Sequence, residues 1–238
     1  MPHGRMGTGR EGSRMLIWSW QGSECGDVLE SGKVWHCDAE RASWGDFFDY
    51  CYDWMASEMV KRVGRPPTGV RWPIWGWARY EFVDGACPKD DDEMVDPSVE
   101  GDYVRLLLDV PDDLVLLSDE DAWGSILNGF PVAPPEWSLV TDEGVLNKLL
   151  DELIDMKKDF DAVAPPDEIL RTWPRVFDTR KVESSIGNWH GRYVQATFWE
   201  IRPEWVIRVQ RFHNVPHRSI YDCDDAIDGD ENSIEPEG

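Results

Sequence analysis

Met15-Leu-Ile-Trp-Ser-Trp-Gln21 sets the fold class, because large apolar residues alternate along this stretch. Leu16, Trp18 and Trp20 follow the two-residue period of a half-buried β-strand. A short helical stretch is expected to follow, ending near Gly32, because glycine is common just past a helix C-terminus. The chain is therefore expected to open with a strand and a short helix.

Patterns further along the chain predict three more helices and several more strands. Helices are expected over residues 46–63, from an N-cap at Ser118 to Asn128, and from Thr141 to Phe160, and strands over residues 34–37, 103–110, 192–201 and 205–212. Strands and helices do not alternate regularly. The sequence thus favours an α+β fold, a single domain with a mixed or antiparallel sheet and three to four helices.

Composition predicts one globular domain over residues 15–215, enough to bury a sizeable core. Residues 1–14 are rich in Gly and Arg and are interpreted as a disordered leader, or as a start assigned too early with Met15 as the true start. Residues 216–238 are acidic, poor in apolar residues and expected to be disordered. With no apolar run long enough for a membrane span or a signal peptide, a cytoplasmic location is expected.

Charge and cysteine usage exclude several classes of protein. The 47 acidic and 24 basic residues give a net charge of −23, which disfavours nonspecific binding to nucleic acids. The five cysteines are an odd number without a C-x-x-C pair, so reduced thiols are expected rather than a disulfide framework. The histidines lack the spacing of metal ligands, and no metal is expected. The common nucleotide-binding and hydrolase motifs are absent.

Fourteen tryptophans are the most unusual feature of the composition. Most are expected in the core, but Trp72, Trp75 and Trp77 lie among prolines and glycines. In an extended chain Trp75 and Trp77 point the same way. They are either core residues or a platform on which a flat ligand stacks.

Four blocks of sequence resemble the domain-of-unknown-function family 3841. They span roughly residues 15–212 and read Trp18-Ser-Trp-Gln21, Pro73-Ile-Trp-Gly-Trp77, Leu116-Leu-Ser-Asp119 with Trp123 and Leu127-Asn128, and Gln195-Ala-Thr-Phe-Trp-Glu200. The family label carries no activity. The resemblance therefore supports one domain and leaves the function open.

A second, architectural likeness is to ADP-ribosyltransferases, which open with a strand, a short helix and a glycine. It implies an enzyme that binds NAD or a related nucleotide, with a carboxylate on the nicotinamide ribose and an aromatic ring on the nicotinamide. The residues that would fill these roles are Glu200, Gln195 and Gln21 as catalytic residues, and Trp18, Trp75 and Trp77 as the cofactor-binding surface. The first strand departs from that pattern, because Trp18 and Gln21 stand where His or Arg is usual.

The alternative is a binding protein without enzymatic activity. Its Trp-rich surface and acidic shell would recognise or inhibit a protein partner, including one that itself binds nucleic acid. The positions of Gln21, Gln195 and Glu200 discriminate between the two hypotheses. Convergence in one pocket favours an enzyme, and scatter over the molecule favours a binding protein.

Overall fold

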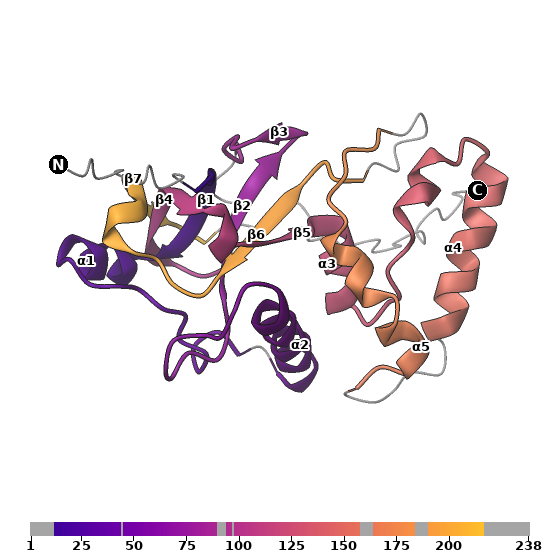
Figure 1. The fold of residues 1–238 in the computed structure, drawn as a ribbon, viewed down its shortest axis with the longest axis horizontal. Coiled ribbons are helices and arrows are strands. Elements are labelled where there is room, and N and C mark those ends of the chain that lie inside the picture. The colour runs from indigo at the N-terminus through magenta and orange to yellow at the C-terminus, as the bar shows by residue number, and fades with distance from the viewer. Residues whose placement is uncertain are drawn as a thin grey trace, which may run out of the picture.

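The computed structural model describes residues 12–43, 45–89, 94–96, 98–157, 164–183 and 190–216. Within these residues the chain forms one antiparallel sheet with five α-helices around it (Figure 1). The predicted α+β class and the antiparallel sheet are confirmed. Most of the leader expected at 1–14 and of the tail expected at 216–238 lies outside the described residues.

The sheet has seven strands in the order β5-β6-β2-β1-β4-β7, and β3 pairs with β2. β1 lies between β2 and β4, and pairs with β4 along its whole length. The strands are β1 Arg14–Gly22, β2 Ile74–Tyr80, β3 Val83–Asp84, β4 Gly101–Pro111, β5 Leu116–Asp119, β6 Val194–Phe198 and β7 Val206–Asn214. The described part of the sheet therefore ends in two edge strands, β5 and β7.

The helices lie at different places along the long axis of the molecule (Figure 1). They are α1 Ser23–Glu30, α2 Asp46–Arg62, α3 Glu120–Leu127, α4 Glu143–Lys157 and the single turn α5 Asp167–Leu170. Figure 1 shows α1 at one end of the long axis and α4 at the other. The helix predicted over residues 46–63 corresponds to α2 and is confirmed.

The two faces of the sheet support two separate clusters of buried side chains. Ile17, Leu106 and Ala196 point to one face, where α1 packs, and we call it the α1 face. Thr197 points to the other face, where its hydroxyl lies 3.3 Å from Met59 Sδ on α2, and we call it the α2 face. The α2 face is covered by α2, α3 and residues 173–177. Both faces bury apolar residues, so the strands show no simple alternation of polar and apolar residues.

The predicted first strand exists, but its most buried positions differ from those expected. Ile17 and Ser19, on the α1 face, are fully buried, whereas Leu16 is 43% exposed. Trp18 is also buried, because the chain after β3 covers it and its indole N–H donates to the Gly85 carbonyl at 3.1 Å. The alternation of large apolar residues correctly predicted a strand, but it did not predict which side of the strand is buried more deeply.

Two other expectations require correction. Residues 34–37 form no strand, because only Trp35 makes an isolated bridge, with Ile201. The cap of α3 is Asp119 rather than Ser118, because the Asp119 carboxylate accepts the N–H of Ala122 at 3.0 Å. No helix in the described ranges is both long enough and apolar enough to cross a bilayer.

Trp18 and Trp54 are predicted to be structural, and truncation of either should destabilise the fold. Trp54 packs edge-on against Trp173 at 5.1 Å between ring centroids and stacks on Phe177 at 5.7 Å. We expect Trp18→Ala and Trp54→Ala each to lower the free energy of unfolding by about 3–5 kcal/mol, measured by urea denaturation. The control Leu139→Ala, at an exposed position, should cost less than about 0.5 kcal/mol. Losses below about 1 kcal/mol for either Trp would contradict the assignment.

Candidate functional site

Four of the six predicted site residues lie on the α2 face of the sheet. Trp77 is directly opposite Trp18 on β1 and directly opposite Gln195 on β6, and paired residues point to the same side. Trp75, two residues from Trp77, also points this way, and its ring lies 4.8 Å from that of Trp123 on α3. The sequence-based expectation that Trp75 and Trp77 point the same way is confirmed.

Gln21 lies on the opposite face. It is three residues beyond Trp18 on the same strand, so its side chain points to the α1 face. Its Oε1 accepts the indole N–H of Trp35 at 3.2 Å, and its Nε2 donates to Ser19 Oγ at 2.9 Å. Neighbouring side chains therefore satisfy Gln21 on its own side of the sheet.

Glu200 occupies a third location, beyond the end of β6. Its Oε1 accepts a hydrogen bond from Arg202 Nε at 2.6 Å, and its Oε2 lies 3.3 Å from His36 Nε2. The structure thus does not assemble Gln21, Gln195 and Glu200 in one pocket. The convergence expected of an enzyme site built from these three residues is therefore not observed.

A cleft elsewhere in the molecule is the better candidate site. It has a volume of about 630 Å³, in the usual range for ligand pockets, and lies between α3, α4 and residues 190–193. We call it the α4 cleft. Leu150, Leu153 and Ile154 of α4 form its apolar wall, and Asp119 and His190 lie at its floor. Prolines 131, 134 and 135 line it from the segment between α3 and α4.

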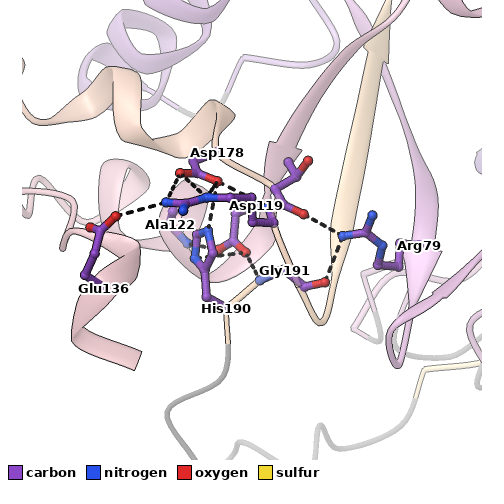
Figure 2. Close-up of polar contacts among 9 residues, drawn as sticks. Arg79, Asp119, Ala122, Glu136, Asp178, His190 and Gly191 are labelled. Carbon is purple, nitrogen blue, oxygen red and sulfur yellow. Dashed lines mark hydrogen bonds and ion pairs between the residues drawn. The ribbon is translucent and has the colours of Figure 1, made fainter. Parts of the chain in front are cut away.

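The carboxylate of Asp119 organises the floor. Asp119 is only 2% exposed, and its Oδ1 accepts the N–H of Ala122 at the start of α3. Its Oδ2 accepts the N–H of Gly191 at 2.8 Å and lies 3.6 Å from His190 Nδ1 (Figure 2). A charged group buried this deeply needs such partners, and backbone N–H donors supply them.

Gly191 allows the chain to approach this carboxylate. Its φ of 68° is in the left-handed region, and an added Cβ would lie 2.2 Å from the Arg180 carbonyl oxygen. Arg79 of β2 reaches in from the sheet and donates to the carbonyls of Thr179 (2.7 Å) and Gly191 (3.0 Å) (Figure 2). Arg79 thus holds the backbone at Thr179 and at Gly191 in place beside the floor of the α4 cleft.

A second set of charges closes the network on the side away from the sheet. Arg180 donates to Asp178 at 2.7 Å and to Glu136 at 3.0 Å, which links two segments at the cleft (Figure 2). His190 Nε2 is buried, lies 3.9 Å from Asp178 Oδ1, and has no hydrogen-bond partner in the described part of the chain. Most of the polar groups are paired with one another, so the network shapes the cleft.

Negative charge gathers at the start of α3. Burial and the neighbouring carboxylates of Asp121 and Asp119 raise the pKa of Glu120 to about 7. Asp121 lines the α4 cleft together with Arg192, and partial burial and the Asp119 carboxylate raise the pKa of Asp121. No group of three or more His, Cys, Asp and Glu side chains in the described ranges is arranged to hold a metal ion.

Sequence reasoning missed this site. Asp119 was expected within the first turn of a helix, and His190 was considered only as a metal ligand. Asp178 and Arg180 lie in a segment for which no element was predicted. The sequence signal for this site was the run His190-Gly-Arg-Tyr193, in which a glycine lies among side chains that can form hydrogen bonds or carry charge.

One comparison with known proteins gives a match. The model of a protein family described as Domain of unknown function (DUF3841) matches residues 16–136. The matched stretch includes three of the four blocks quoted above, and the block at residues 195–200 lies beyond it, as does α4. No curated protein and no solved structure matches the chain.

The raised pKa of Glu120 predicts a stability that falls as the pH rises. Between about pH 4.5 and 7 the unfolded chain releases this proton while the folded chain retains it, so ionisation favours unfolding. We expect Glu120→Gln to raise the free energy of unfolding by about 2 kcal/mol at pH 8 and by much less at pH 5. Urea denaturation at the two pH values measures this, with Glu143→Gln on α4 as the control. Equal effects at both pH values would contradict the prediction.

Unpaired polar atoms on the α2 face give a second prediction. Ser118 Oγ, Gln195 Oε1 and Trp75 Nε1 are buried without a hydrogen-bond partner among the described residues, and Ser118 pairs directly with Gln195. An unsatisfied buried hydroxyl is costly, so Ser118→Ala should be neutral or should stabilise the fold by up to about 1 kcal/mol in thermal or urea unfolding. A loss above about 1 kcal/mol would show that the hydroxyl has a partner in solution.

Proposed function

We propose that this chain, which belongs to the family DUF3841 of unknown function, is an interaction protein that binds a basic amphipathic segment of a partner protein in the α4 cleft. The observation that carries the proposal is the exposed apolar surface that the acidic helix α4 presents to the cleft. Leu150 and Ile154 line the cleft and are 39% and 47% exposed, whereas Leu146 is buried and anchors the helix.

The spacing of these residues suits a helical partner. Leu146, Leu150 and Ile154 recur every four residues and therefore follow one side of α4. An amphipathic helix that lays its apolar side into a groove uses anchors at this spacing. Full burial of a Leu or Ile side chain contributes about 1.5–3 kcal/mol, so two such side chains supply a useful share of the binding free energy.

Charge favours a basic partner. α4 carries four acidic and two basic residues, the cleft is lined by the carboxylates of Asp119 and Asp121 and by one guanidinium, that of Arg192, and the whole chain has a net charge of −23. A field of this sign speeds the approach of a cationic segment and slows that of an acidic one. The resulting affinity should depend strongly on salt.

The arrangement of polar groups at the cleft favours binding over chemistry. Asp119, Asp178 and Arg180 are engaged with one another or with backbone groups, and His190 Nε2 is buried. The ADP-ribosyltransferase hypothesis placed Gln21, Gln195 and Glu200 in one site, and these residues lie apart. Binding of NAD stays a prediction.

Fluorescence anisotropy tests the proposal with a labelled amphipathic peptide of Leu and Lys, about five helical turns long. We expect saturable binding that weakens at least tenfold between about 0.05 and 0.5 M salt. The same peptide with Glu in place of Lys should not bind. Leu150→Glu and Ile154→Glu should each weaken binding about tenfold, because each places a charge in the apolar wall.

The matched control is Ile207→Glu, which alters a 55% exposed Ile on β7 at the other edge of the sheet. It should bind the basic peptide like the wild type. Equal affinities for Ile154→Glu and Ile207→Glu, or equal binding of the acidic peptide, would overturn the proposal. A dimer of the wild-type chain in light scattering that Ile154→Glu dissociates would also overturn it, because the occupant would then be a second copy.

A further inference from the structure

A second cavity, separate from the α4 cleft, lies beyond the end of β6. Its volume is about 290 Å³, and it shares no lining residue with the α4 cleft. We call it the Glu200 pocket. Its lining includes Arg65 and Pro66 from the segment after α2, Trp199 and Glu200 from the end of β6, and Arg202 and Trp205. Leu114 also lines it, so three separate segments of the chain meet around the pocket: residues 65–67, Leu114 and residues 198–205.

The pocket is cationic in a strongly acidic chain. Arg65 is exposed and makes no ion pair with any described residue. Arg202 uses its Nε to donate to Glu200, and its two terminal nitrogens make no hydrogen bond within the described ranges. Its side chain is 45% exposed but held in place by the ion pair with Glu200. Two guanidinium groups thus present unused N–H donors to one cavity, an arrangement that suits a phosphate or carboxylate.

The walls of the pocket are aromatic and stiff. Trp199 is buried, and its indole N–H donates to the Gly64 carbonyl at 2.9 Å, which fixes its ring. Trp205 is buried under Arg202, whose guanidinium carbon lies 5.4 Å from the ring centroid. Pro66 adds a rigid rim next to Arg65. Only narrow strips of the two indole rings are exposed, so they offer a flat ligand apolar contact along their edges.

We propose that the Glu200 pocket binds a small planar organic anion, an aromatic ring that carries a phosphate or carboxylate. Arg65 and Arg202 hold the anionic group, and Trp199 and Trp205 contact the ring. Glu200 acts as a positioning residue, because both of its oxygens are engaged, by Arg202 and by His36. The volume suits one ring system and one anionic group, as in a nucleoside monophosphate, and is small for a dinucleotide.

Isothermal titration calorimetry of the full chain tests this proposal with adenosine monophosphate as the probe. Binding should saturate in the low millimolar range or below, while adenosine and inorganic phosphate, which each supply half of the contacts, should bind at least tenfold more weakly. NAD should bind more weakly than the monophosphate. Indole acetate replaces the phosphate by a carboxylate, and tighter binding of this compound would identify the ligand as a carboxylate of the same class.

A variant at Arg65, which is exposed and has no ion-pair partner among the described residues, avoids the risk of unfolding. Arg65→Ala should weaken binding of adenosine monophosphate about tenfold without lowering the melting temperature, and Arg65→Lys should restore part of the affinity. Arg202→Ala should weaken binding by a similar factor and also lower the melting temperature, because it leaves the largely buried Glu200 carboxylate without its guanidinium partner. Arg171→Ala, at an exposed arginine near α5, is the matched control and should bind like the wild type. No saturable binding of the monophosphate or of indole acetate would overturn the proposal, as would equal affinities for Arg65→Ala and Arg171→Ala.

Discussion

The buried carboxylate of Asp119 is the interaction on which the edge of the sheet and the α4 cleft both depend. It is the last residue of β5, caps α3 through Ala122, and binds the N–H of Gly191 just before β6. One side chain thus fixes a strand end, a helix start and the loop between two segments. Without it, two buried N–H donors would lack partners, each at a cost of about 1–3 kcal/mol. The position of the cleft floor therefore depends on this side chain.

Local patterns predicted much of the fold. α2 and β4 follow from periodic apolar residues whose spacing alone defines a helix or a strand. The buried side of β1 could not be predicted, because both faces of the sheet are covered. Ser19 is fully buried although polar, since its hydroxyl donates to the Trp75 carbonyl at 2.8 Å on the neighbouring strand. A hydrogen bond of this kind depends on which strands pair, which no single segment of sequence reveals.

The same dependence on register explains the outcome for the site. Gln195 and Trp77 lie side by side because their strands pair directly, and Gln21 is lost from that face because it is an odd number of residues from Trp18. The network of Asp119, Asp178 and His190 joins segments far apart in the sequence. Gly191 is the residue of this network that stands out most in the sequence. A glycine can be required for many reasons, however, and only the structure shows that this one is required by the nearby Arg180 carbonyl.

The two proposed sites bind ligands of opposite charge. The net charge of the chain acts at its surface, whereas neighbouring side chains set the charge inside a pocket. At physiological salt the field of an exposed charge fades within about 8 Å, so the net charge of −23 governs approach to the surface and not the contacts inside a pocket. The α4 cleft is open to solvent beside the acidic helix α4, which suits a basic segment. In the Glu200 pocket one carboxylate faces two guanidinium groups, Arg65 and Arg202, so the local balance is positive. Under the two proposals, the same acidic chain binds a cationic partner at one end and an anion beside its sheet.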